Sequence, residues 1–175
     1  MVRVEPITQE GYDLLLLEFK FLKDKEKPKV NREKQEAAAQ GDRSENADYH
    51  AAKEKLRHID KRLFYLNSMI EKSKIIDPSI LKHDRVSFGS TITLLDLESD
   101  EEREITICGV LESEPDNLLI SIHAPLSQAM LGKLEGDDFI VTLPNGKKEY
   151  EIVKIEYINI FSLKQVIKSE KEFAV

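Results

Sequence analysis

The sequence predicts an α+β protein in which an N-terminal antiparallel helical hairpin precedes a small antiparallel β-sheet with one short helix. Apolar residues recur at helical spacing as far as about residue 73, and strand-like alternation begins at Arg85. The Pro-Asn-Gly turn at 144–146 is typical of a β-hairpin. We therefore expect a coiled-coil hairpin at residues 1–77, a globular β domain at 78–158 and a C-terminal extension at 159–175.

Composition and charge exclude several classes of protein. The chain has 175 residues, of which 34% are charged and 7% aromatic, so we expect extended solvated surface beside a modest core. A net charge of -7 argues against a general nucleic-acid binder. That charge is unevenly distributed, because residues 1–77 hold 16 Lys/Arg against 15 Asp/Glu and the remaining 98 hold 10 against 18. The asymmetry indicates two modules with different partners.

Targeting and redox signals are absent from the sequence. The single cysteine, Cys108, permits no internal disulfide and lies in an apolar strand-like run, so we expect a buried structural thiol. There is no signal-peptide pattern, and no apolar run approaches the roughly 20 residues that span a membrane. We expect a soluble cytoplasmic protein.

The first predicted helix begins after Thr8, a candidate N-cap, and runs toward Gln40. Pro28 lies inside it and removes a backbone donor, so a kink is expected there. Gly41 is then a candidate helix terminator, because glycine adopts a left-handed conformation without strain.

The second predicted helix runs from Ala47 to about Ser73 and carries a coiled-coil seam. Its apolar residues alternate steps of three and four: Tyr49, Ala52, Leu56, Ile59, Leu63, Leu66 and Ile70. Two helices joined by a short connection are antiparallel neighbours. A helix of about 27 residues is roughly 40 Å long, so the hairpin is expected to project into solvent.

The β domain is predicted from five strand-like runs around one short helix. The strands are expected at 86–94, 104–110, 117–122, 139–143 and 147–157, and the helix at 125–131. A proline in the first turn and a glycine after the last support that helix.

The connection between the two long helices concentrates three carboxylates, Asp42, Glu45 and Asp48, within seven residues. On spacing alone, helix capping by Asp42 or Ser44 is the favoured interpretation, with Glu45 complementing the helix dipole. The alternative is a partial metal site. Two carboxylates cannot hold Mg²⁺ alone, because the ion requires six oxygen ligands, so a partner would have to supply the rest.

Behind this connection Lys53, Arg57 and Lys61 recur every four residues and share one helix face. A solvated surface is the usual explanation for such a stripe. The alternative is contact with a nucleic-acid backbone just behind the acidic connection around Asp42 and Glu45, which we call the tip.

The stretch Gly41-Asp42-Arg43-Ser44-Glu45-Asn46-Ala47-Asp48-Tyr49-His50-Ala51-Ala52-Lys53 resembles the hallmark of the Gre family (GreA/GreB type), bacterial transcript cleavage and elongation factors that bind RNA polymerase. The resemblance covers residues from about 5 to 158. It includes further matches at 75–77, 86–90, 120–126 and 131–137.

The resemblance implies a function. In this family the hairpin enters the secondary channel of RNA polymerase, and an FKBP-like second domain docks at the channel rim. Asp42 and Glu45 would help to hold the second catalytic Mg²⁺ and orient the attacking water, while the polymerase hydrolyses the 3′ part of a backtracked RNA. The RNA-contacting residues implied by the resemblance are Arg43, Lys53, Arg57 and Lys61. The protein would be a monomeric cofactor of the polymerase and not itself an enzyme.

The implied docking loop contains Ser121, His123, Ala124 and Pro125. The family often has Asp-Ser-Pro where this chain has His-Ala-Pro, so an acidic contact is missing. The tip with Arg43 resembles the GreB branch, whereas Gly132-Lys133 and Gly136-Asp137 resemble GreA, which leaves the subtype open.

Two other functions are considered. One is a channel-binding inhibitor without cleavage activity, against which the presence of both Asp42 and Glu45 argues. The other is an FKBP-like prolyl isomerase or chaperone, which rests on fold analogy alone and would need more aromatic residues for a proline pocket.

Overall fold

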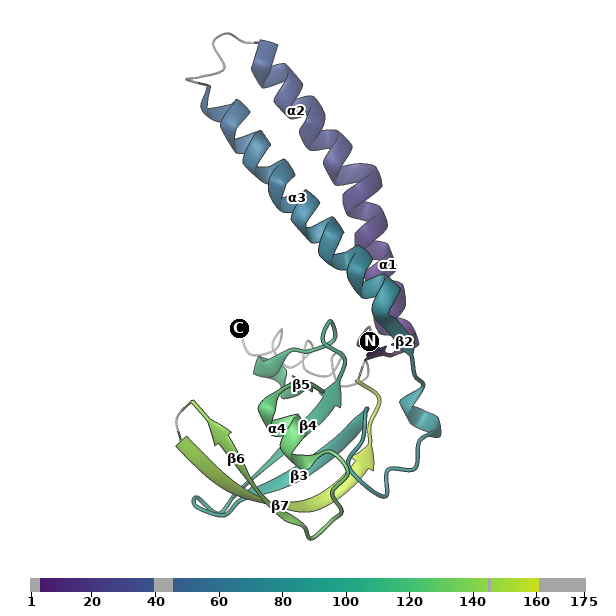
Figure 1. Ribbon diagram of the computed structural model, residues 1–175, viewed down its shortest axis with the longest axis vertical. Coiled ribbons are helices and arrows are strands. Elements are labelled where there is room, and N and C mark those ends of the chain that lie inside the picture. The colour runs from purple at the N-terminus through teal and green to yellow at the C-terminus, as the bar shows by residue number, and fades with distance from the viewer. Residues whose placement is uncertain (1–3, 40–45, 145, 161–175) are drawn as a thin grey trace, which may run out of the picture. The chain divides into compact units, whose positions relative to one another are not determined.

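The computed structural model describes residues 4–39, 46–144 and 146–160, and the chain forms two compact units. The helical unit is built from Tyr12–Ser73. The β unit combines Glu5–Gly11 with the chain from Lys74 onward. Figure 1 shows the elements of each unit.

Three α-helices, α1 (Gln9–Phe21), α2 (Lys27–Ala39) and α3 (Ala47–Lys72), confirm the two predicted helical stretches. Thr8 is the N-cap of α1, because its Oγ1 accepts a 3.0 Å hydrogen bond from the backbone N–H of Gly11. Helices α2 and α3 run side by side as a hairpin (Figure 1). None of the helices within the described residues is long and apolar enough to cross a membrane.

A kink was expected at Pro28, and just before it the structure has a π-helical turn at Leu22–Glu26, between α1 and α2. The backbone N–H of Lys27 bonds to the carbonyl of Leu22, five residues back. Proline has no N–H for the residue four positions before it, so the regular hydrogen-bond ladder cannot continue through Pro28. Where π-helix occurs, it is mostly as a single turn inside an α-helix, as here.

The hairpin is held together by an apolar seam. Val30 is fully buried between the helices and packs with Ala52, Leu56 and Ile59, each at most 8% exposed. This confirms the central part of the predicted seam. Further along α3, Met69 is buried beside the predicted Leu66. There α3 lies along α1, as a bidentate ion pair between Arg62 and Glu18 at 2.7 and 2.8 Å shows.

The β unit contains a five-stranded sheet with the strand order β5-β4-β3-β7-β6. Its strands are β3 (Ser90–Asp96), β4 (Glu101–Cys108), β5 (Leu119–Ser121), β6 (Asp138–Leu143) and β7 (Gly146–Tyr157). Strand β5 runs parallel to β4, so the expected purely antiparallel sheet needs this correction. After β4 the chain loops back through residues 109–118 until Leu119 lies beside Thr106. From there β5 runs in the same direction as β4 and pairs Ser121 with Cys108.

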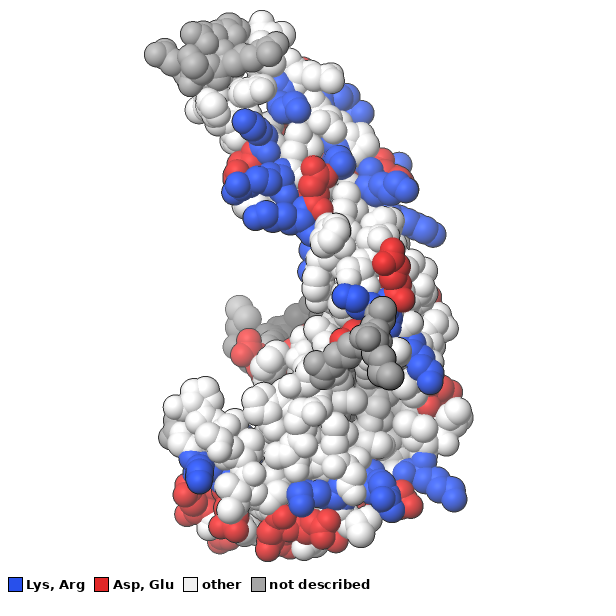
Figure 2. Space-filling model, viewed as in Figure 1, with Lys and Arg blue, Asp and Glu red and all other residues white. Residues whose placement is uncertain are grey.

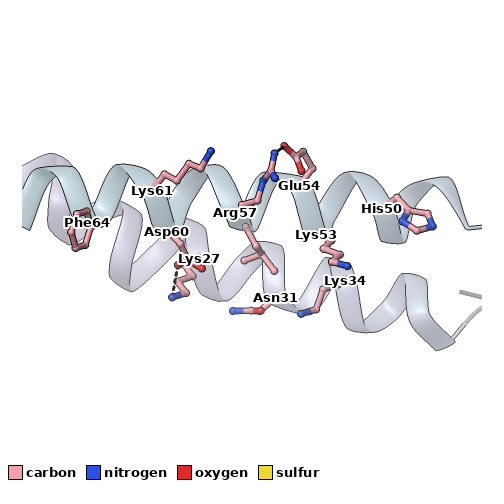
Figure 3. A pocket seen from close by; sticks show the side chains of 11 residues that line it. Lys27, Asn31, Lys34, His50, Lys53, Glu54, Arg57, Asp60, Lys61 and Phe64 are labelled. Carbon is pink, nitrogen blue, oxygen red and sulfur yellow. Dashed lines mark hydrogen bonds and ion pairs between the residues drawn. The ribbon is translucent and has the colours of Figure 1, made fainter. Parts of the chain in front are cut away.

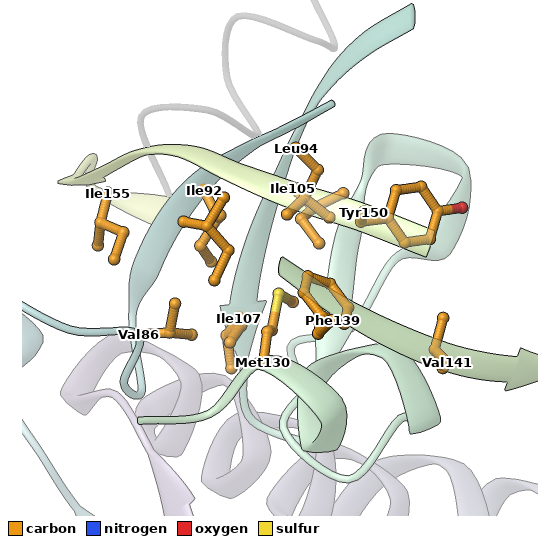
Figure 4. Packing of buried hydrophobic residues seen from close by; sticks show 11 residues of the cluster. Val86, Ile92, Leu94, Ile105, Ile107, Met130, Phe139, Val141, Tyr150 and Ile155 are labelled. Atoms are coloured by element: carbon orange, nitrogen blue, oxygen red, sulfur yellow. The ribbon is translucent and has the colours of Figure 1, made fainter. Parts of the chain in front are cut away.

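The sheet curls around one apolar core, which is closed by the short helix α4 (Pro125–Met130). Met130 of α4 lies against side chains from several strands, including Ile92, Ile107 and Phe139 (Figure 4). Cys108 is fully buried in a smaller cluster with Leu119 and Ile160, which confirms the expected structural thiol.

A second, two-stranded sheet pairs β1 (Glu5–Ile7) with β2 (Ser73–Ile75), and the sequence did not predict it. Next to it, the carboxylate of Glu112 is 2% exposed and accepts hydrogen bonds from the backbone N–H and hydroxyl of Thr8 and from the N–H of Gly109. These donors compensate the lost hydration of the carboxylate. Glycine is required beside it, because a Cβ at Gly11 or Gly109 would lie 2.3 or 2.7 Å from a carboxylate oxygen.

Candidate functional site

The two helix ends that flank the acidic tip are joined by Asn46. Its Oδ1 accepts a 3.0 Å hydrogen bond from the N–H of Tyr49, and its Nδ2 donates a 2.7 Å bond to the carbonyl of Ala37. One side chain thus caps α3 and binds the last turn of α2. The tip residues Asp42, Arg43 and Glu45 lie outside the described residues.

The cap assignment changes the interpretation of the acidic residues. The sequence favoured Asp42 or Ser44 as the N-cap of α3, and this was wrong, because Asn46 occupies that position. Asp48 is the acidic residue in the first helical turn. Helix α3 therefore requires neither Asp42 nor Ser44 as its cap. The preference for Asn at N-caps was a usable sequence signal for this position.

A groove between α2 and α3 follows the hairpin and encloses about 1120 Å³. We call it the basic groove. Its lining comes from both helices: Lys27, Asn31, Lys34, His50, Lys53, Glu54, Leu56, Arg57, Asp60, Lys61 and Phe64. Figure 3 shows the lining side chains along its length, from His50 at one end to Phe64 at the other.

The basic groove has a net charge of +3, from five Lys/Arg and two Asp/Glu. Both of its acids are paired: Asp60 with Lys27 at 2.7 Å and Glu54 with Arg57 at 2.6 Å. The hydrogen bond from Arg57 lowers the pKa of Glu54. Within the part of the chain that the structure describes, no ion pair engages Lys34, Lys53 or Lys61.

The structure places Lys53, Arg57 and Lys61, the stripe identified in the sequence, along this one groove. It adds Lys27, Asn31 and Lys34 from the facing helix, which sequence reasoning missed. A stripe on one helix follows from spacing, but the residues opposite it depend on how the two helices pair.

A second groove on the same hairpin has the opposite charge. We call it the acidic groove; it encloses about 390 Å³ and is lined by Glu33, Glu36, Ala37, Asp48, Ala51, Ala52 and Lys55. Three acids and one lysine give it a net charge of -2. The lysine is itself paired with Glu26 at 2.7 Å, which raises the pKa of Lys55 and lowers that of Glu26. Figure 2 shows the Lys and Arg side chains that gather over one face of the hairpin.

The predicted docking residues Ser121, His123, Ala124 and Pro125 are close together in the β unit. Ser121 ends β5, its Oγ accepts a bond from the N–H of His123, and Ala124 and Pro125 begin α4. The ring of His123 contacts Glu5, with Nε2 2.5 Å from Oε2. The structure therefore joins these residues into one turn before α4.

Metal ligands do not cluster among residues 4–39, 46–144 and 146–160: no three His, Cys, Asp or Glu side chains there could hold an ion together. The two candidate ligands from the sequence, Asp42 and Glu45, belong to the tip outside these ranges.

Two family models together match most of the chain. Residues 5–75 match "Transcription elongation factor, N-terminal", and residues 81–157 match "Transcription elongation factor, GreA/GreB, C-term".

Similar proteins include "Transcription elongation factor GreA" from a Nitratiruptor species, which is 48% identical over 157 residues, covering 90% of this chain and 96% of the relative. The GreA of Aliarcobacter butzleri is 47% identical, with 89% and 97% covered. That of one Helicobacter pylori strain is 44% identical, with 89% and 95% covered.

Among solved structures, Gfh1 of Thermus thermophilus is 24% identical with a TM-score of 0.43, covering 88% of this chain and 99% of Gfh1. A GreA/GreB factor from Nitrosomonas europaea is 26% identical with a TM-score of 0.40, covering 54% and 79%.

Proposed function

This chain belongs to the GreA/GreB family of transcription elongation factors, and we propose that it binds bacterial RNA polymerase and stimulates the polymerase to cleave backtracked RNA. The hairpin of α2 and α3 would enter the secondary channel of the polymerase and bring its tip to the catalytic centre. The protein would rescue arrested complexes in the bacterial cytoplasm without hydrolysing RNA by itself.

The observation that carries this proposal is the position of Asn46. Because Asn46 caps α3, the capping requirement of the helix does not account for Asp42 and Glu45. The same side chain bonds the carbonyl of Ala37, so the two ends of the tip segment are anchored to each other. A segment that is flanked by anchored residues and carries two acids not needed as the N-cap suits a catalytic tip better than a simple turn.

The donor set fits magnesium, which binds carboxylate oxygens by preference and commonly through only a few protein ligands. Asp42 and Glu45 would supply part of the coordination sphere, and the polymerase and RNA phosphate the rest. When bound there, Mg²⁺ would lower the pKa of a water molecule and offset charge on the phosphodiester. The role of this chain is to position its two carboxylates beside the scissile bond and to orient that water.

The basic groove would accept the RNA that extrudes toward the hairpin. Lys53 and Lys61 are cations without an ion pair in the described part of the chain, and Arg57 lies between them. Such groups neutralise phosphates and position a strand without reading its sequence. Arg43 would extend this contact at the tip.

The turn before α4 is the proposed docking surface of the β unit on the polymerase. Its residues Ser121, His123, Ala124 and Pro125 are arranged by the N-terminus of α4 and by the contact of His123 with Glu5. His123 occupies the position where an acid is common in the family. The polymerase surface would therefore be contacted by a hydrogen bond from an imidazole and not by a carboxylate.

The proposal is tested on a backtracked RNA polymerase complex that carries end-labelled RNA. The wild-type protein, added with Mg²⁺, should make the polymerase cleave the RNA rapidly, and Asp42→Ala and Glu45→Ala should abolish nearly all of this stimulation while still binding the polymerase. Asp48→Ala is the matched control, because Asp48 is a nearby acid that belongs to the first turn of α3 and to the acidic groove. It should retain most of the activity.

Equal cleavage by the wild type and the tip variants would contradict the metal-ligand role. A wild-type protein that binds the complex and slows elongation without any cleavage would identify a channel-binding inhibitor.

A further inference from the structure

We propose that Phe64 is a stacking platform for an RNA base and that it makes the basic groove sensitive to the length of the extruded RNA. The inference rests on the proposed function, because it requires RNA to lie along the hairpin. It assigns a specificity-determining role to a residue at the end of the groove farthest from the tip.

Phe64 is exposed to an unusual degree for an aromatic residue. It lines the basic groove, yet 80% of its surface is accessible, and it lies outside the seam that packs Val30 against Ala52, Leu56 and Ile59. Figure 3 shows its ring at one end of the groove, beyond Lys61 and Asp60. The fold of the hairpin therefore gains little from this side chain, and the ring face is available to a ligand.

The combination of a cationic groove and an exposed aromatic ring suits single-stranded nucleic acid. Three cations precede Phe64 on successive turns of α3: Lys53, Arg57 and Lys61. They would contact the phosphates of a strand that lies along the groove. An aromatic ring then stacks on a base of any sequence, because every base has a π face. A folded duplex or an acidic peptide would use the cations but would have no unstacked base for Phe64.

The distance from the tip makes this contact dependent on length. Helix α3 begins at Ala47, so Phe64 lies 17 residues further, or about 26 Å along the helix axis. At the stacked spacing of about 3.4 Å per nucleotide, a strand needs roughly eight nucleotides to cover that distance. RNA extruded by only a few nucleotides would end among the lysines near the tip and would not contact Phe64.

The chain offers a matched control residue. Phe21, at the end of α1, is also an exposed phenylalanine of the helical unit, with 54% of its surface accessible, but it does not line the basic groove. Removing its ring tests whether any exposed aromatic residue on these helices affects activity.

The experiment compares cleavage rates for RNA backtracked by about three and by about twelve nucleotides, lengths on either side of the estimated reach. Phe64→Ala should slow cleavage of the long substrate about fivefold to tenfold, in line with the loss of one stacked base, and leave the short one within about twofold. With Phe64→Tyr added, the polymerase complex should cleave the long substrate at the wild-type rate. With Phe64→Leu, cleavage should be as slow as with Phe64→Ala, because leucine is apolar but has no π face. Phe21→Ala should match the wild type on both substrates.

Equal slowing of both substrates by Phe64→Ala would overturn the inference and indicate a contact with the polymerase instead. Full activity of Phe64→Ala or of Phe64→Leu on the long substrate would also overturn it. A wild-type protein that stimulates no cleavage at all would remove the proposed function and the inference with it. Cleavage by the wild type without any length-dependent defect in the variants would remove the inference alone.

Discussion

The two grooves of the hairpin are formed by the same pair of helices and differ in the sign of their charge. The basic groove has a net charge of +3 and the acidic groove -2, although residues 1–77 as a whole hold 16 Lys/Arg against 15 Asp/Glu. Helical phase, and not composition, therefore sets the charge of each face. Residues four apart share a face, so three cations at that spacing create one sign over several turns.

In each groove every charge of the minority sign is held in an ion pair, and the pairs within the basic groove leave its net charge unchanged. In the basic groove Asp60 is paired with Lys27 and Glu54 with Arg57, and the single lysine of the acidic groove is paired with Glu26. Lys53 and Lys61 remain as cations that a phosphate can approach without competing with a bound carboxylate. The basic groove is therefore the one suited to RNA.

The largest effect is expected from a change that removes the contrast by loosening both grooves. Leu56 is 8% exposed and packs in the seam on Val30. Leu56→Ala should lower the free energy of unfolding by about 2–4 kcal/mol, because it deletes buried side-chain volume. Urea unfolding followed by the helical circular-dichroism signal measures this. A loss below about 1 kcal/mol would mean that the seam does not hold the hairpin.

A charge test separates the two grooves directly. Lys53→Ala combined with Lys61→Ala leaves the groove at +1 and should slow cleavage of backtracked RNA about tenfold at physiological salt, through the loss of two phosphate contacts. The rate should also depend less steeply on salt concentration. Glu33→Ala combined with Glu36→Ala in the acidic groove is the matched control and should stay within about twofold. Equal defects in the two double variants would end the functional distinction between the grooves.

A smaller effect is expected from replacing Asn46, whose side chain joins α2 to α3, the two helices that form both grooves. Asn46→Ala loses the cap of α3 and the bond to Ala37, and should lower the free energy of unfolding by about 1–2 kcal/mol. Asn46→Asp keeps the cap oxygen but loses the Nδ2 donor. If anchoring the tip matters, Asn46→Asp should be as stable as the wild type within about 1 kcal/mol and yet stimulate cleavage by the polymerase more weakly. Wild-type cleavage by Asn46→Asp would show that the bond to Ala37 does not position the tip.

The smallest effect concerns the pH dependence of the paired acid Glu54. Its pKa is lowered by Arg57, so the ion pair stabilises the fold above the usual Glu range and this contribution is lost as pH falls through the lowered value. Glu54→Gln should therefore lower the urea midpoint of unfolding slightly at neutral pH. The difference from the wild type should vanish well below about pH 4. A difference that is constant across this range would exclude the ion pair as its cause.

Much of the fold could be predicted because its signals are local. The seam of α3, the cap at Thr8 and the buried Cys108 follow from spacing and residue type over a few positions. The parallel pairing of β5, the burial of Glu112 against Thr8 and the pairing of β1 with β2 join residues far apart in the chain. No local pattern carries that information.

In the candidate site, too, the local features could be predicted from the sequence and the features that depend on helix pairing could not. Spacing predicted the stripe of Lys53, Arg57 and Lys61, but the facing Lys34 depends on the register between two helices. The capping role of Asn46 was hidden because several neighbouring residues are equally good caps, and only the backbone geometry distinguishes them. The roles of Asp42 and Glu45 in metal binding stay a prediction.

The proposed path of the RNA is tested most directly by locating the RNA on the hairpin. A backtracked complex can carry a photoreactive 4-thiouridine about eight nucleotides from the catalytic centre, and the crosslinked peptide can be identified by mass spectrometry. The expectation is attachment to α3 in the basic groove, at or next to Lys61 and Phe64. Attachment to the acidic groove, or to the β unit alone, would contradict it.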